Sequence, residues 1–217
     1  MNLNTIHEHY LLLALEHAKI RQGHCSPNPS VGAILVYNQG LESSVLTIGV
    51  HWQAGLPHAE VNAIDKMRQN LEKFDSKDFS LYVTLEPCCH FGKTPPCTDL
   101  ILSAGIKKVY FAYLDPNPIV SGKGMQLLNS QGVECKHLPC HPIDEFYESY
   151  KYFVTKGMPF VRYKLALTKN KMYTNKESLL TKNRLCLTTS CPQIQEFTAL
   201  NRKKADALLT SSKKLSY

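Results

Sequence analysis

The sequence predicts an α/β protein with a mixed, mostly parallel sheet covered by helices on both faces. After an initial hairpin, apolar runs of strand length alternate with segments of helical periodicity, the pattern that favours βα units. Some of these runs, such as 109–113, are almost wholly apolar, as in strands buried on both faces. The 217 residues suffice for one core, or one domain and part of a second.

Glycine, proline and turn residues separate the expected elements. The first helix spans 7–21 and ends before Gly23, and strands at 31–37 and 45–50 form a hairpin around the turn at 38–40. The other elements follow in chain order: helix 58–67, strand 81–85, helix 98–104, strand 109–113, helix 124–130, strand 133–138 and helix 143–154.

A boundary at Gly157-Met158-Pro159 divides the expected domain 1–156 from a segment 157–217. In that segment we expect a strand at 160–167, a helix at 191–202 and a strand at 205–209. These elements are too few for an independent domain of ordinary size.

The composition favours a cytoplasmic protein without a membrane partner. No apolar run approaches the roughly 20 residues of a membrane span, and the first residues lack a secretory signal. In such a chain, cysteines are expected to be reduced thiols or metal ligands. There are eight of them: Cys25, Cys88, Cys89, Cys97, Cys135, Cys140, Cys186 and Cys191.

The net charge of +7 is unevenly distributed. Residues 1–150 carry 11 Lys+Arg against 15 Asp+Glu, and residues 151–217 carry 14 against 3. A basic tail is one signature of nucleic-acid binding. Here the basic residues are scattered with few aromatics between them, so we expect no nucleic-acid partner.

Four residues have the chemistry of a catalytic zinc site. His58, Cys88 and Cys97 supply the imidazole and thiolates that Zn²⁺ prefers, and three protein ligands leave a fourth position for water. Zinc lowers the pKa of that water to near 7. Glu60 lies two residues after His58, where it can accept and return a proton. A His-x-Glu motif with a downstream Pro-Cys and a further Cys is typical of zinc deaminases.

A structural zinc site is the alternative for the same residues. Such a site usually has four protein ligands. Cys89 or His90 would be the fourth.

Several long motifs resemble the deaminase half of the bifunctional deaminase–reductases of riboflavin biosynthesis, over about residues 7–157. They are Ser26-Pro27-Asn28-Pro29-Ser30-Val31-Gly32, His51 with Ala54-Gly55-Leu56-Pro57-His58-Ala59-Glu60, the run from Tyr82 to Cys97, Asp115-Pro116-Asn117-Pro118, and Gly122-Lys123-Gly124. The resemblance implies a cytidine-deaminase-like, three-layer α/β/α domain.

The resemblance also implies the reaction. The 2-amino group of 2,5-diamino-6-ribosylamino-4(3H)-pyrimidinone 5′-phosphate is removed hydrolytically, giving 5-amino-6-(5-phosphoribosylamino)uracil and ammonia. Water activated by zinc attacks the ring carbon, and Glu60 passes the proton to the leaving ammonia. Cytidine and tRNA-adenosine deaminases typically carry Pro-Cys-x-x-Cys, whereas eight residues separate Cys88 from Cys97 here. Within that gap, His90 and Lys93 suit a phosphate.

By the same resemblance, Asn28 binds the pyrimidine, and the ribose phosphate is held by His51, His90, Lys93, Asp115 and Asn117. Alternatives stay open. Asn28 and Asp115 are also ordinary turn residues, and His90 and Lys93 would be equally at home in a solvated loop.

The segment after residue 156 departs from the family's reductase half. Gly157-Met158-Pro159-Phe160-Val161 and Lys164-Leu165-Ala166-Leu167 match it. The next family motif, Ser-Leu-Asp-Gly-Lys, is replaced by Thr168-Lys169-Asn170-Lys171-Met172, and the later segments are missing. We expect a truncated reductase-like remnant that binds no NADPH and has no reductase activity. The family tendency predicts a homo-oligomer.

Two other functions compete with the riboflavin-pathway deaminase. A tRNA-type base deaminase would account for the zinc site and the basic tail, but not for the long gap between the cysteines or the acidic residues 1–150. A non-catalytic relic with a structural zinc would account for the altered reductase half, but not for the retained Glu60.

Overall fold

A computed structural model describes residues 3–40, 42–69, 78–92, 94–118 and 120–161 of the chain. Apart from Val161, these residues belong to the first of two units, Met1–Phe160. The helix at 191–202, the strand at 205–209 and all of the strand at 160–167 but its first two residues lie outside the described residues.

Five strands form one sheet in the order β2-β1-β3-β4-β5. Their bounds are β1 (Gly32–Gln39), β2 (Glu42–Val50), β3 (Phe79–Leu85), β4 (Lys108–Tyr113) and β5 (Glu134–His137). β1 runs antiparallel to both β2 and β3, whereas β3–β4 and β4–β5 are parallel. The sheet is mixed as predicted, but parallel pairs make up half of its pairings rather than most. The hairpin is the reason, since it reverses β1 against both of its neighbours.

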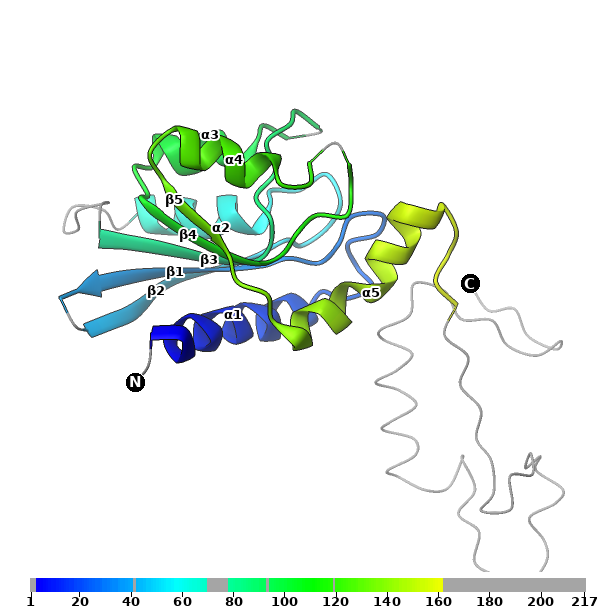
Figure 1. Cartoon of the computed structure of the whole chain (residues 1–217), viewed down its shortest axis with the longest axis horizontal. Coiled ribbons are helices and arrows are strands. Elements are labelled where there is room, and N and C mark those ends of the chain that lie inside the picture. The colour runs from blue at the N-terminus through cyan, green and yellow to red at the C-terminus, as the bar shows by residue number, and fades with distance from the viewer. Residues whose placement is uncertain (1–2, 41, 70–77, 93, 119, 162–217) are drawn as a thin grey trace, which may run out of the picture. The chain divides into compact units, whose positions relative to one another are not determined.

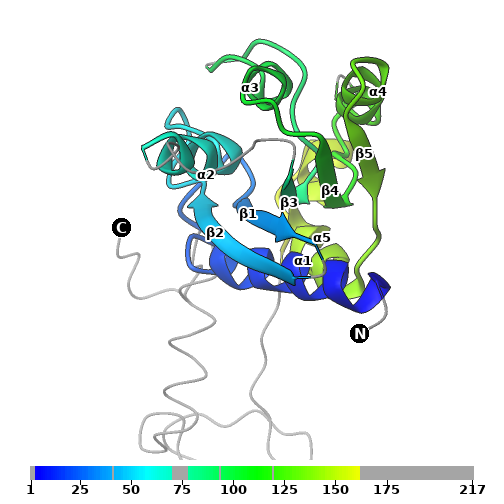
Figure 2. The same ribbon diagram turned by 90° about the vertical axis from the view of Figure 1, so that its left-hand side faces the viewer.

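Five helices cover the two faces of this sheet. They are α1 (Leu3–Lys19), α2 (Ala59–Arg68), α3 (Cys97–Ser103), α4 (Lys123–Ser130) and α5 (His141–Lys156). In Figure 1, α2, α3 and α4 lie above the sheet, and α1 and α5 lie below it. Figure 2 shows α2 over the β2 side and α4 over the β5 side. The three-layer α/β/α arrangement is therefore confirmed.

The core lies between these layers, and β3 runs through its centre. All seven residues of β3 are buried, because helices cover both of its faces. A strand in this position is expected to be mainly apolar on both sides, as its run of Leu81, Tyr82 and Val83 is. The carboxyl end of β3 leads directly into the candidate site.

One close backbone contact positions α2 on the sheet. Gly49 of β2 faces the first turn of α2, and a Cβ at residue 49 would lie 1.9 Å from the carbonyl oxygen of Ala59. Only glycine permits this approach. The contact determines how closely the start of α2, which carries His58 and Glu60, lies against β2.

The expected elements within the described residues are all present, with shifts of a few residues at their ends. The largest shift is in α1, which begins at Leu3 and ends at Lys19 instead of spanning 7–21. After Lys19 the chain turns through i→i−3 backbone hydrogen bonds from Ile20 and Arg21. In the described part of the chain, no helix is both long and apolar enough to cross a membrane.

Candidate functional site

Three side chains with metal-binding chemistry meet at the carboxyl end of β3. His58 immediately precedes α2, Cys88 follows three residues after the end of β3, and Cys97 is the first residue of α3. The Nδ1 of His58 lies 3.2 Å from the Sγ of Cys97 and 3.6 Å from the Sγ of Cys88. One ligand atom from each residue lies within 4.8 Å of the other two.

These distances fit a tetrahedral zinc ion. Zinc bonds of about 2.0–2.1 Å to nitrogen and 2.3 Å to sulfur place the ligand atoms of a tetrahedron about 3.5 Å apart for an N–S pair. The two His58–cysteine distances agree with this value, and the donor set is the one that zinc prefers.

The metal-ligand cluster has three members in the described part of the chain, and neither Cys89 nor His90 belongs to it. Three protein ligands are typical of catalytic zinc sites, whereas closed structural sites usually have four.

Neighbouring groups hold the ligands in place. The backbone N–H of Cys97 donates to the Sγ of Cys88 at 3.3 Å, and that of Thr98 donates to the Cys88 carbonyl at 3.1 Å. A hydrogen bond from the Cys97 thiol lowers the pKa of Cys88 well below its ordinary value, which favours the thiolate that binds metal. The other ring nitrogen of His58, Nε2, lies 3.3 Å from the hydroxyl of Thr94, the kind of contact that orients a ligating histidine.

Glu60 lies in the first turn of α2, beside the cluster but outside it. Its side chain is 4% exposed. Burial raises the pKa of Glu60 to about 7, against the opposing effect of the nearby His58. A carboxyl group with a pKa near neutrality can both accept and return a proton at physiological pH.

Asn28 and His51, two of the predicted substrate-binding residues, lie together next to His58. The Nδ2 of Asn28 is 3.5 Å from the Nε2 of His51. The rings of His51 and His58 pack edge to face, with centroids 5.3 Å apart. The Nδ1–H of His51 donates to the carbonyl of Pro57 at 3.1 Å, so Nε2 is the nitrogen that faces Asn28.

A second group lies after β4. Asp115 accepts a hydrogen bond at Oδ1 from the backbone N–H of Asn117 at 2.8 Å, and burial raises the pKa of Asp115. His90 is close enough to act in the opposite direction on that pKa. The predicted residue Lys93 lies outside the described residues. The structure thus places the predicted substrate residues it describes in two groups, one of them against the metal-ligand cluster.

Some structural partners of the site come from distant segments and were not predicted. The hydroxyl of Tyr147, on α5, donates to the carbonyl of Ser30 at 2.9 Å and contacts the hydroxyl of Thr84 at 2.6 Å. Tyr150 donates to Asp115 at 3.3 Å. The sequence carried no local signal for these contacts, because the paired residues lie 35 or more positions apart in the chain.

A His/Cys/Cys metal site beside a glutamate that does not bind the metal is the arrangement of zinc-dependent deaminases. The fold and the site therefore define a protein of that class. In agreement, residues 4–113 match the model of the cytidine and deoxycytidylate deaminase zinc-binding region.

Curated relatives narrow the family. The chain is 42% identical over 165 residues to the riboflavin biosynthesis protein RibD of Aquifex aeolicus, covering 76% of this chain and 44% of the relative. It is 42% identical over 127 residues to the diaminohydroxyphosphoribosylamino-pyrimidine deaminase of Buchnera aphidicola, covering 58% of this chain and 80% of the relative. The chain belongs to the zinc-binding deaminase family, and within it to the RibD-type deaminases of riboflavin biosynthesis.

A solved structure agrees. Form 1 of Acinetobacter baumannii RibD matches with a TM-score of 0.75 and 29% identity, over 93% of this chain and 52% of that one. The chain therefore spans about half the length of this structure and somewhat less than half of the Aquifex relative.

Proposed function

We propose that this protein catalyses the hydrolytic deamination of 2,5-diamino-6-ribosylamino-4(3H)-pyrimidinone 5′-phosphate to 5-amino-6-(5-phosphoribosylamino)uracil and ammonia. The observation that carries the proposal is the buried Glu60 beside the three side chains of the His58–Cys88–Cys97 cluster. The 42% identity to the Buchnera deaminase, most of whose length is covered, supports this substrate.

In this proposal the cluster binds Zn²⁺ through His58, Cys88 and Cys97. A bound zinc ion supplies a water that ionises near neutral pH. Glu60 would accept a proton from the attacking water and return it to the 2-amino group. The water oxygen would stay bonded to the ring carbon as the C–N bond breaks, and ammonia would leave. The buried carboxyl of Glu60, whose pKa burial raises to about 7, can hold or release a proton near neutral pH.

Two groups of residues bind the substrate in this proposal. Asn28 and His51 lie beside the metal-ligand cluster, and we therefore propose that they bind the pyrimidine end. The family resemblance had instead assigned His51 to the ribose phosphate. Asp115 and Asn117 bind the ribose, with His90 and Lys93 on the phosphate. The buried carboxylate of Asp115 is a hydrogen-bond acceptor suited to ribose hydroxyls.

A substrate panel tests this assignment. The zinc-loaded protein should release ammonia from the diaminopyrimidine ribose phosphate, and much more slowly from the dephosphorylated compound, deoxycytidylate or the adenosine of a tRNA. An equal rate with the dephosphorylated compound would contradict the phosphate role of His90 and Lys93. Deamination of tRNA alone would establish the competing base-deaminase function.

The remaining expectations also form part of the proposal. We also propose that the enzyme is cytoplasmic, forms a homo-oligomer and has no nucleic-acid partner. We expect residues 157–217 to confer no reductase activity. Turnover of the deaminated product with NADPH, or micromolar affinity for NADPH, would refute that expectation.

A further inference from the structure

Glu86 is a buried carboxylate that the proposed chemistry does not use. It lies between the end of β3 and the zinc ligand Cys88, and it is 3% exposed. Its Oε2 accepts a hydrogen bond from the backbone N–H of Gly122 at 2.8 Å, and its Oε1 accepts one from that of Met125 at 3.2 Å. The carboxylate therefore caps α4, where the helix dipole favours a negative charge.

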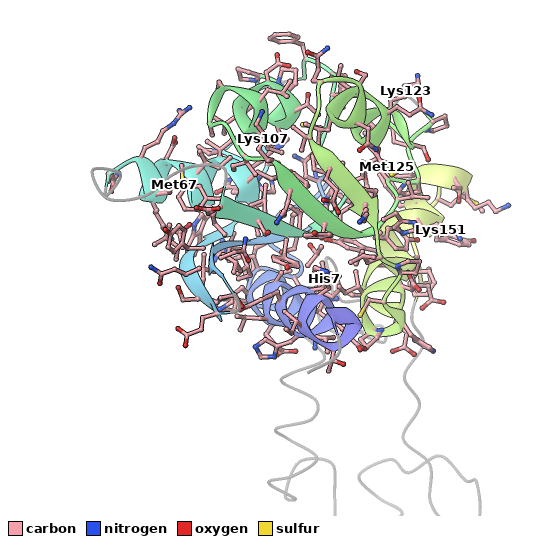
Figure 3. The ribbon with its side chains drawn as sticks, turned by 60° about the vertical axis from the view of Figure 1, so that its left-hand side comes forward. His7, Met67, Lys107, Lys123, Met125 and Lys151 are labelled. Atoms are coloured by element: carbon pink, nitrogen blue, oxygen red, sulfur yellow. The ribbon has the colours of Figure 1, made fainter. Side chains whose placement is uncertain are left out.

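The backbone around Glu86 is fixed as well. The N–H of Glu86 donates to the carbonyl of Tyr113, at the end of β4, at 2.9 Å. The carbonyl of Pro87 lies against Gly124, where an added Cβ would be only 2.1 Å from the Pro87 oxygen. Lys123 and Met125, labelled in Figure 3, mark the first turn of α4, to which this segment is attached.

Cys88 follows immediately and is attached on its other side to α3. Its carbonyl accepts from the N–H of Thr98, and its Sγ accepts from that of Cys97. The segment that carries this ligand is thus held between the N-termini of two helices. One attachment uses the metal ligands themselves, and the other depends on Glu86.

We propose that Glu86 is a positioning residue for the metal centre, which sets the place of Cys88 by fastening the β3–α3 segment to the first turn of α4. The inference rests on the metal centre of the proposed function, but not on its substrate. The substitution Glu86→Gln removes the charge and keeps the size of the side chain. It would place an amide NH₂ against the backbone N–H of either Gly122 or Met125. That donor then loses its acceptor, and Cys88 shifts relative to His58 and Cys97.

The test is zinc affinity, measured by competition with a chromophoric chelator well below the melting temperature of each variant. Outer partners of metal ligands typically contribute about tenfold or more to affinity, and we expect a loss of about that size in Glu86→Gln. The d–d absorption of the Co²⁺-substituted protein should also change in position or intensity. Glu134→Gln, which removes an exposed carboxylate paired with Lys136, is the control and should leave both readouts unchanged.

Gly124→Ala tests the same attachment from the α4 side with no change in charge, and it should weaken zinc binding in the same direction. Folded variants with a lower melting temperature but unaltered zinc affinity and cobalt spectrum would overturn the inference, because Glu86 would then serve stability alone. A wild-type protein that binds zinc but releases no ammonia would refute the proposed function and leave this inference intact.

Discussion

At the scale of single residues, the site contains buried acidic side chains whose pKa values are raised by burial. Glu60 is buried against thiol and imidazole groups, and its pKa of about 7 follows mainly from the loss of water around the carboxylate. Asp115 is 8% exposed, and burial raises its pKa too. Such shifts have a cost in stability, because a group that ionises less readily in the folded state destabilises that state when charged.

Asp115→Asn should therefore separate stability from activity. Since the folded pKa of Asp115 is raised, its ionisation costs stability above the unfolded pKa of about 4, and the cost disappears as the pH falls below that value. Asn keeps an oxygen acceptor for Asn117 and Tyr150. We expect this variant to melt higher than wild type at pH 7, with the difference vanishing below about pH 4, while kcat/KM falls.

Thermal melts over that pH range check the expectation, with Glu148→Gln on the exposed side of α5 as the control. A gain in melting temperature that is the same at every pH would show that ionisation of Asp115 is not its source.

The clustering of His58, Cys88 and Cys97 was predictable from the sequence, because these residues stand in short motifs with recognisable spacing. His58 is the N-cap residue of α2 and Glu60 lies in its first turn, and Cys88 and Cys97 flank one loop. Glu86 stood next to Cys88 in the sequence, yet its partners Gly122 and Met125 lie more than thirty residues away. Nothing local predicts such a pairing, and the same holds for Tyr147 and Ser30.

At the scale of elements, the start of α2 is the part that must be placed most accurately, since it carries both His58 and Glu60. It packs against β2 through the close backbone contact between Gly49 and Ala59. The side chains of neighbouring residues add to this contact: Asn62 donates to the Val50 carbonyl at 2.8 Å, and Thr47 donates to that of Ala63 at 2.8 Å.

Gly49→Ala should displace α2. The added Cβ would meet the backbone at Ala59 and at Ala63, with the nearest atom 1.9 Å away, and backbone cannot yield as a flexible side chain can. Overpacking of this kind costs about 1–3 kcal/mol of folding free energy. We expect that loss in urea unfolding, together with reduced zinc affinity.

Ser44→Ala, at an exposed position of the same strand, is the matched control. If Gly49→Ala unfolds at the same urea concentration as this control, α2 does not pack as closely against β2 as the Gly49 contact indicates.

Element types were predictable because the periodicity changes between strands and helices and because Gly and Pro punctuate the chain. The balance of parallel and antiparallel pairs was not, since it depends on which strand β1 joins. The sequence pattern shows that 31–37 and 45–50 form a hairpin, but the pairing of β1 with β3 is a tertiary contact.

At the scale of the whole molecule, the described residues form one α/β/α unit with the site at one end of its central strand. The site is built within this unit, from the loop before β1 to α5. Every predicted metal and proton-transfer residue falls inside it, and the chain spans only about half the length of these RibD relatives.

The central claim is that a metal held by His58, Cys88 and Cys97 and a proton carrier at Glu60 together remove an amino group. The most direct measurement is ammonia release from the diaminopyrimidine ribose phosphate by the zinc-loaded protein and by Glu60→Gln at equal zinc content. We predict release by the wild-type protein and a loss of at least about 10²-fold in the variant. No release by the wild-type protein at full zinc occupancy, or equal rates for the two proteins, would contradict the account.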